Sequence, residues 1–327
     1  YFTPPMEQEL PTTTTPPPTM MVTSRLLCSI EELCLDKVLP TGQCFRWKKK
    51  GDWWLGVIGD SLWKLRQDDG MISYSIFSRG MKQKDSKCFW DNALRQYFQL
   101  HVPLASMLEE WKCSDPTFDT VSSEYYGIRI LRQEPIENLF SFICSSNNNI
   151  MRITSMVNRL CELYGDVLGT FDGEVYYTFP QVEKLADKGV ENMLRQNGFG
   201  YRAKFVQTCA QQILMRGGDT WLESLRQLKF QEARTELSRL SGVGLKVADC
   251  VCLMSLGFNK SVPIDTHMHH IAVSKYLLKL PSTKSLTTSQ YETIQKHYQA
   301  LFGEYAGWAQ AVLFNVQLNS KRKHSKK

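Results

Sequence analysis

The spacing of apolar residues changes once along this chain, and that change restricts the fold class. Between about residues 23 and 80, short runs rich in aromatic and β-branched residues alternate with period two: Trp53–Ile58, Leu62–Leu65 and Met71–Phe77. Gly59-Asp60 and Asp69-Gly70 separate these runs with turn signals. After about residue 90 the period becomes about 3.6 residues, as in a helix. The sequence therefore predicts an α+β protein, with an N-terminal antiparallel sheet followed by a mainly helical body.

The helical part carries its own start signals. Apolar residues at 136, 139, 140 and 143 share one helix face, and Pro135 fits the first turn. Asn149 is a good N-cap for a second helix that starts at Ile150. Further helices are expected near 203–215, 221–240, 245–256, 266–279, 289–302 and 305–318.

Composition divides the chain into four segments. Residues 3–19 hold six of the 13 prolines, so we expect residues 1–22 to be a disordered leader. A β-rich domain should span 23–130 and a helical domain 131–318, with a helix-hairpin-helix at 238–250. Residues 319–327 form a basic tail.

Charge and cysteine content limit the function classes. The net charge is +6, but five cations lie in residues 321–327, so a polyanion would have to bind a local patch or placed backbone amides. No apolar run approaches the roughly 18 residues of a membrane span, and we expect no membrane association. The ten cysteines form no CxxC pair and should be reduced. None follows Cys252, which excludes a four-cysteine iron–sulfur cluster in the C-terminal part.

The most informative stretch runs from Leu240 to Asp249. One helix should end near Leu240 and another begin near Leu245, so that Gly242 and Gly244 form a tight turn with positive φ available. The free amides and the dipole of the new helix would then form an anion site suited to a nucleic-acid phosphate. A plain connection between helices is the alternative, but the flanking apolar residues and a following lysine favour phosphate binding.

Lys246 and Asp265 are candidates for covalent chemistry. The positive potential of a helix start disfavours the ammonium form of Lys246, and a neutral amine can form a Schiff base with a sugar carbon. An ordinary solvated lysine is an equally good interpretation. Asp265 should cap the next helix, and its carboxylate could also stabilise an electron-poor sugar. His267 and His270 lie one turn apart, but without a third ligand a zinc site is less favoured than phosphate contact or packing.

Several motifs together resemble the helix-hairpin-helix glycosylase superfamily and, within it, the eukaryotic 8-oxoguanine DNA glycosylase/AP lyase family. They are GQCFRW at 42–47, LRQEP at 131–135, FSFICSSNNN at 140–149, GYRA at 200–203 and YAGWAQAVLF at 305–314, and the resemblance covers roughly 25–318. It implies a bifunctional repair enzyme for double-stranded DNA that flips out 8-oxoguanine paired with cytosine and excises it. Lysine attack on the sugar C1′ is followed by strand cleavage through β-elimination.

The resemblance also assigns roles to residues. Lys246 is the nucleophile and Asp265 its acidic partner. The Gly42 carbonyl accepts a hydrogen bond from N7–H of the oxidised base, Gln310 binds the Watson–Crick edge, and Phe314 and Cys250 sandwich the ring. The base-binding set is Gly42, Cys250, Met254, Pro263, Asp265, Gln310 and Phe314, and the DNA-binding set is Asn147, Arg152, Tyr201, Arg202, Gly242, Gly244 and His267. Within the second set, the resemblance places Asn147, Arg152 and Arg202 at the orphaned cytosine of the opposite strand and makes Tyr201 the wedge that holds the vacated stack open. Without the resemblance, Phe314 and Met254 would be core residues and Arg152 and Arg202 solvated surface charges.

No cofactor and no iron–sulfur cluster are implied, although the main-chain carbonyls of Ser238, Leu240 and Val243 are a candidate site for a structural cation. We expect a monomer in the nucleus, while mitochondrial routing stays open. Three positions depart from the family pattern: Ser241 replaces a proline, Cys44 a serine and His269 an aromatic residue. A glycosylase for another damaged base and a non-catalytic DNA-binding module remain the alternatives.

Overall fold

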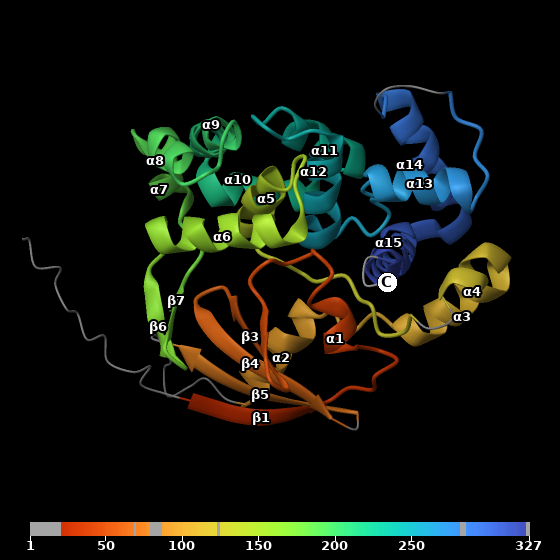
Figure 1. The fold of residues 1–327 in the computed structure, drawn as a ribbon, viewed down its shortest axis with the longest axis horizontal. Helices are drawn as coiled ribbons and strands as arrows, with labels where there is room; N and C mark the ends of the chain where they lie inside the picture. Colours follow the sequence, from red (N-terminus) through yellow and green to blue (C-terminus); the bar gives the residue numbers. More distant parts are fainter. Residues whose placement is uncertain (1–20, 69, 79–86, 123–124, 282–285, 325–327) are drawn as a thin grey trace, which may run out of the picture.

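The computed structural model describes residues 21–68, 70–78, 87–122, 125–281 and 286–324, and it confirms the predicted fold class. A five-stranded antiparallel sheet forms the lower part of the molecule and helices form the upper part (Figure 1). No helix in the described ranges is long and apolar enough to cross a membrane.

The sheet contains the three predicted strands and two more at its edges. The strands are β1 (Met21–Leu27), β2 (Lys48–Lys50), β3 (Trp53–Ile58), β4 (Ser61–Asp68) and β5 (Met71–Ser78), in the order β1-β5-β4-β3-β2. Every neighbouring pair is antiparallel. Because β1 begins at Met21, the last two residues of the predicted leader belong to the sheet, and residues 1–20 lie outside the described part.

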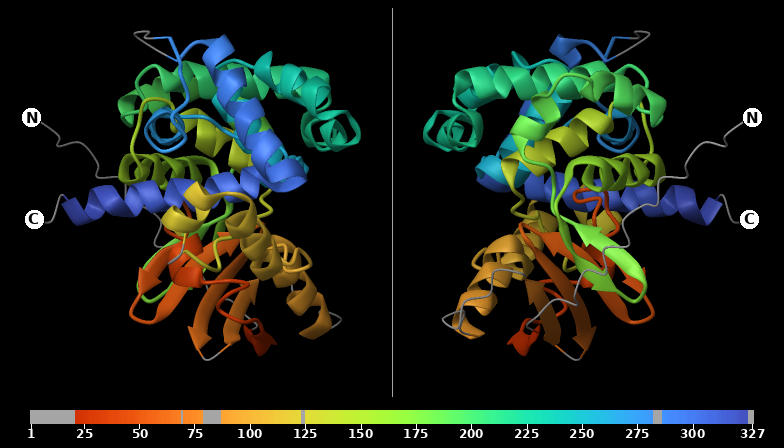
Figure 2. Two further views of the ribbon diagram at one scale, coloured as in Figure 1. Left: turned by 90° about the vertical axis from the view of Figure 1, so that its right-hand side faces the viewer. Right: turned by 90° about the vertical axis from the view of Figure 1, so that its left-hand side faces the viewer.

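Each face of the sheet is covered by a different part of the chain. Helix α2 (Lys87–Tyr97) covers one face, where the Trp90 and Trp63 rings meet edge to face at 5.7 Å. The hairpin of β6 (Val167–Phe171) and β7 (Glu174–Tyr177) covers the other face, where Phe171 lies 5.1 Å from the Phe77 ring (Figure 2). A hairpin from the helical half of the sequence therefore completes the core of the sheet.

The helical body surrounds α5 (Pro135–Cys144), which is buried at eight of its ten positions. Its other main helices are α6 (Ile150–Tyr164), α9 (Arg202–Arg216), α11 (Phe230–Ser238), α12 (Leu245–Val251), α13 (Thr266–Ser274), α14 (Thr288–Phe302) and α15 (Ala306–His324). The shorter ones are α1 (Leu35–Val38), α3 (Leu104–Ser114), α4 (Pro116–Ser122), α7 (Val182–Ala186), α8 (Val190–Gln196) and α10 (Gly218–Ser224), with 3₁₀ turns η1 (Leu225–Gln227) and η3 (Gly303–Tyr305). Helices α3 and α4 share the core of this body and lie beside α15 (Figure 1).

Four predicted helices differ in extent from the expectation. The helix expected at 221–240 is interrupted at Leu228, whose backbone is extended, and α11 restarts after it with Glu232 accepting from the Lys229 amide at 3.1 Å. The helix at 245–256 ends in a π-helical turn, η2 (Cys252–Leu256). The helix near 266–279 ends at Ser274. Conversely, α15 continues to His324, past the expected end at 318 and into the predicted basic tail (Figure 2).

Candidate active site and nucleic-acid groove

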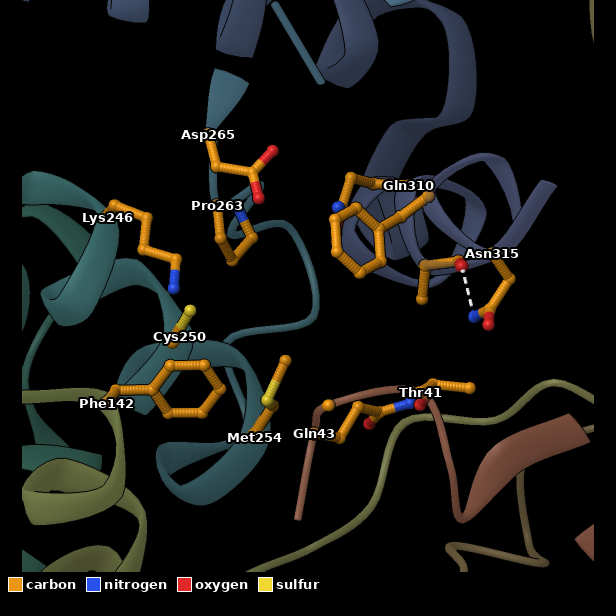
Figure 3. A pocket seen from close by; sticks show the side chains of 13 residues that line it. Thr41, Gln43, Phe142, Lys246, Cys250, Met254, Pro263, Asp265, Gln310 and Asn315 are labelled. Carbon is orange, nitrogen blue, oxygen red and sulfur yellow. Dashed lines mark hydrogen bonds between the residues drawn. The ribbon is translucent and has the colours of Figure 1, made fainter. Parts of the chain in front are cut away.

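A pocket lies where the 41–43 turn of the N-terminal part meets α12, η2, the segment before α13 and α15 (Figure 3). The cavity is about 70 Å³ in volume. It is lined by Thr41, Gly42, Gln43, Phe142, Lys246, Cys250, Met254, Pro263, Asp265, Gln310, Ala311, Phe314 and Asn315. The structure thus brings Lys246 together with all seven residues predicted to bind the base, although these residues come from distant parts of the sequence.

The amine of Lys246 reaches the pocket from the first turn of α12. Its Nζ donates a hydrogen bond to Ser145 Oγ at 3.0 Å and lies 4.7 Å from the centre of the Phe142 ring. Ser145 Oγ in turn donates to the Phe142 carbonyl at 2.7 Å, which fixes the hydroxyl that receives the amine. The lysine is therefore held at the pocket by two residues of the α5 C-terminus.

Asp265 caps α13, as the sequence predicts. Its Oδ1 accepts from the amides of His267 at 2.9 Å and Met268 at 3.0 Å. Its second oxygen receives no hydrogen bond from the described residues, and the carboxylate lines the same pocket as Lys246. Figure 3 shows these two side chains entering on the side opposite Gln310 and Asn315.

Apart from Lys246 and Asp265, the residues that line the pocket are uncharged. Burial raises the pKa of the Cys250 thiol to about 12, with the nearby Lys246 opposing the shift and Asp249 and Asp265 adding to it. The thiol is therefore protonated at neutral pH and presents an uncharged sulfur. Met254 lies on the π-helical turn η2.

Gln310 presents a side-chain amide to the pocket. Only 5% of the residue is exposed, yet its side-chain amide makes no hydrogen bond to the part of the chain that the structure describes. Asn315, by contrast, donates to the Ala311 carbonyl at 2.8 Å (Figure 3). Since buried amides are normally hydrogen-bonded, Gln310 is available to a polar ligand in the pocket.

A wider groove of about 1040 Å³ opens from the pocket and shares Gly42, Phe142, Lys246, Asp265 and Phe314 with it. The starts of four helices line this groove: α6 at 149–150, α12 at 244–245, α13 at 265–266 and α14 at 287–288. Among the described residues that line the groove, Lys246 is the only lysine or arginine and Asp265 is the only aspartate or glutamate. An anion in this groove would therefore meet helix amides and dipoles and not a cluster of cations.

The hairpin before α12 packs against α9. Gly242 has φ +80°, and a Cβ there would lie 2.7 Å from the Phe205 Cβ, so this position requires glycine. Gly244 does not adopt positive φ as expected: its backbone is extended, and a Cβ would meet no atom within 4 Å. Ser241 donates its amide to Gln212 Oε1 at 2.7 Å, a bond that the proline common in the family could not make.

The predicted contacts to the opposite strand gather around the turn after α5. Tyr201 Oη donates to the Ser146 carbonyl at 3.1 Å, and the Arg202 guanidinium donates to the carbonyls of Ser146 and, at 3.1 Å, Asn147. Arg202 is only 3% exposed, so its interpretation as a solvated charge is wrong. Arg152 is exposed, with Nη2 3.4 Å from the Gly198 carbonyl.

The two histidines and the candidate cation site differ in their contacts. The His267 ring packs edge-on against Phe314 at 5.7 Å, and His270 Nδ1 lies 3.3 Å from Ser274 Oγ. The described residues contain no group of three His, Cys, Asp or Glu placed to hold a metal. The Leu240 carbonyl already accepts from the Val243 amide at 3.1 Å. A cation at Ser238, Leu240 and Val243 stays a prediction.

The departures Cys44 and His269 leave the pocket lining unchanged. Cys44 is buried beside Glu137, with Sγ 3.9 Å from Oε1, and His269 is half-buried on α13. Sequence reasoning missed Ser145 and Phe142 as partners of Lys246. They lie within the FSFICSSNNN motif, but the contact spans 101 positions and no local pattern predicts it.

Comparisons with known proteins identify two family domains. Residues 25–139 match the 8-oxoguanine DNA glycosylase, N-terminal domain, and residues 140–296 match the HhH-GPD superfamily base excision DNA repair protein. The chain is 38% identical to the N-glycosylase/DNA lyase OGG1 of Arabidopsis thaliana, over 89% of this chain and 79% of that protein. It is 36% identical to the N-glycosylase/DNA lyase of Saccharomyces cerevisiae, over 90% and 86% respectively.

Among solved structures, the chain is similar to the Clostridium acetobutylicum 8-oxoguanine glycosylase/lyase in complex with double-stranded DNA containing cytosine opposite 8-oxoguanine. That similarity has a TM-score of 0.77 at 27% identity, covering 92% of this chain and 98% of the bacterial one.

Proposed function

The chain belongs to the N-glycosylase/DNA lyase family of 8-oxoguanine repair enzymes, and we propose that its pocket excises 8-oxoguanine paired with cytosine. The observation that carries the proposal is the meeting of the Lys246 amine, the Asp265 carboxylate and the Gly42 backbone in one pocket. That pocket opens into a groove lined by helix N-termini. The groove suits a DNA backbone and the pocket suits a flipped base.

Base recognition rests on the polar groups left open in the pocket. The Gly42 carbonyl accepts a hydrogen bond from N7–H of 8-oxoguanine, whereas normal guanine presents a lone pair there. Two acceptors would then face each other without a proton between them, which disfavours guanine. The Gln310 amide binds the Watson–Crick edge, and the Cys250 sulfur and Phe314 ring contact the two faces of the base.

The covalent step joins Lys246 to the sugar. As the bond from Nζ to C1′ forms, the bond from C1′ to the base N9 breaks, the base leaves with the electron pair and takes up a proton, and the amine loses a proton. Positive charge develops on the sugar during this exchange. The open oxygen of Asp265 stabilises that charge, since its other oxygen is held by the α13 amides.

Strand cleavage follows from the same intermediate. The sugar ring opens to an imine on Nζ, which acidifies the hydrogens on C2′. Loss of a C2′ proton and departure of the 3′ phosphate complete a β-elimination, and water then releases the lysine. Only Lys246 and Asp265 take part in the chemistry, so a cation at Ser238, Leu240 and Val243 would have a structural role.

Borohydride trapping tests the proposal. The protein is mixed with duplexes that carry 8-oxoguanine opposite cytosine, 8-oxoguanine opposite adenine, or unmodified guanine. We expect a covalent adduct mainly with the first duplex and none with the Lys246→Gln variant, which should still bind DNA. Tight binding without an adduct would overturn the lysine mechanism. A fourth duplex that carries an alkylated base tests the alternative, and an adduct with that duplex alone would identify a different lesion.

A nuclear location is the second part of the proposal. Five cations in residues 321–327 form a candidate import signal for an enzyme whose substrate is DNA. Removing these seven residues from a fluorescent fusion should reduce its nuclear fraction. An unchanged distribution would contradict an import role for these residues.

A further inference from the structure

The turn that carries Gly42 is attached to a distant linker through one buried glutamine. Gln43 Nε2 donates to the Arg129 carbonyl at 2.8 Å, and its Oε1 accepts from the Leu131 amide at 3.0 Å. The side-chain amide thus pairs with the linker as a neighbouring strand would. Both bonds are buried and span 86 and 88 positions of the sequence.

A second glutamine, Gln133, donates a hydrogen bond to the backbone of Gln43. Gln133 Nε2 donates to the Gln43 carbonyl at 3.0 Å, and the Gln133 backbone amide donates to the Met254 carbonyl at 2.8 Å. Gln43 and Met254 line the base pocket from two segments that are far apart in the sequence. Gln133, which is itself 6% exposed, therefore links these two segments.

Hydrogen bonds hold the residues on both sides of Gly42, but not the Gly42 carbonyl itself. On one side, Thr41 donates to the Val38 carbonyl from its Oγ1 at 2.7 Å. On the other, Gln43 is held by its side chain and its carbonyl. The Gly42 carbonyl itself accepts no hydrogen bond from the described part of the chain. The surrounding bonds fix the backbone on both sides of this acceptor and leave the acceptor itself without a hydrogen bond from the described residues.

We propose that Gln43 and Gln133 are positioning residues that set the Gly42 carbonyl for the oxidised base and thereby determine specificity. This inference rests on the proposed function and deepens it. The Gly42 contact is useful only if the acceptor stands at hydrogen-bond distance from N7–H, because a small misplacement can remove most of the rate advantage. Neither glutamine contacts the sugar, so cleavage of a preformed abasic site does not need them.

The test compares Gln133→Met with a matched control, Gln99→Met. Methionine keeps the length and volume of Gln133 but leaves the Gln43 carbonyl without its donor. Gln99 is equally buried and donates to the Ile130 carbonyl of the same linker at 2.9 Å, but among the described residues it makes no hydrogen bond to Gly42 or Gln43. Both variants lose one buried hydrogen bond, and both replaced residues are unbranched at Cβ.

Two single-turnover rates are measured on each protein: excision of 8-oxoguanine opposite cytosine, and cleavage at a preformed abasic site opposite cytosine. We expect Gln133→Met to lower excision about tenfold or more and to reduce discrimination against guanine, with abasic-site cleavage within twofold of wild type. Gln99→Met should leave both rates within twofold. Gln133→Asn, which keeps the amide but shortens its reach, should show the same split if Gln133→Met does not fold.

Three results overturn the proposal: unchanged excision by folded Gln133 variants, a parallel loss of both rates, or the same excision loss in Gln99→Met. A wild-type protein that cleaves abasic DNA but does not excise 8-oxoguanine would refute the proposed function and the role of the two glutamines with it.

Discussion

Lys246 and Ser145 are joined by a 3.0 Å hydrogen bond from Nζ to Oγ. The serine lies at the C-terminus of α5 and the lysine at the N-terminus of α12, so this bond spans the two helices that meet beneath the groove. It places the amine beside the Phe142 ring before any DNA is bound.

Ser145→Ala should lower single-turnover excision about three- to tenfold, because the amine loses the contact that orients it. DNA affinity should not change. Ser146→Ala is the control, since Ser146 binds Tyr201 and Arg202 through its backbone carbonyl only. Rates are measured by quenched-flow cleavage of a labelled duplex. An equal loss in both variants would contradict a specific role for the Ser145 hydroxyl.

The two glycines of the hairpin should respond differently to alanine. Gly242→Ala forces a left-handed backbone on alanine and brings its Cβ against Phe205, so we expect a loss of about 1–3 kcal/mol in the free energy of unfolding. Gly244→Ala should cost less than about 0.5 kcal/mol, because its backbone is extended and the site is open. Urea denaturation measures both. Similar losses would contradict a left-handed backbone at Gly242 and an extended one at Gly244.

Asp249 lies on α12 three residues after Lys246 and is fully buried. Its carboxylate accepts from Tyr291 at 2.6 Å and Gln295 at 3.0 Å and lies 3.1 Å from Arg234. Burial raises its pKa to about 6, although Arg234 and these hydrogen bonds oppose the shift. An unfolded Asp has a pKa of about 3.9. Between this pH and about pH 6, the Asp249 carboxyl is therefore protonated to a greater extent in the folded state than in the unfolded state.

The contribution of Asp249 to stability is therefore greatest below about pH 4 and is lost as the pH rises through about 6. We expect the free energy of unfolding of wild type, relative to Asp249→Asn, to fall between pH 4 and 6 and to stay constant above that. Urea unfolding of both proteins from pH 4.5 to 7.5 measures this difference. A difference that grows with pH would show that the Arg234 ion pair dominates instead.

Local patterns predicted the elements better than the contacts between them. Alternation predicted β3, β4 and β5, and capping chemistry predicted α6 at Asn149 and α13 at Asp265. The β6–β7 hairpin was missed because its apolar side chains pack on a sheet far away in sequence. The resemblance supplied the pocket residues, but Ser145, Phe142 and the Gln43–Gln133 contact depend on tertiary structure alone.

Arg152 and Arg202 are both expected to face the orphaned cytosine, but their alanine substitutions should have different effects. Arg202→Ala leaves the Asn147 carbonyl without its buried donor and the Ser146 carbonyl with Tyr201 Oη alone, so we expect a loss of about 1–3 kcal/mol in the free energy of unfolding. Arg152 is exposed with a long contact to Gly198, so Arg152→Ala should leave stability unchanged and instead lower the preference for cytosine over adenine opposite the lesion. Urea unfolding and excision rates on both duplexes measure the two effects. If Arg202→Ala also folds with wild-type stability, its guanidinium is not an anchor for the turn after α5 but is free to bind DNA.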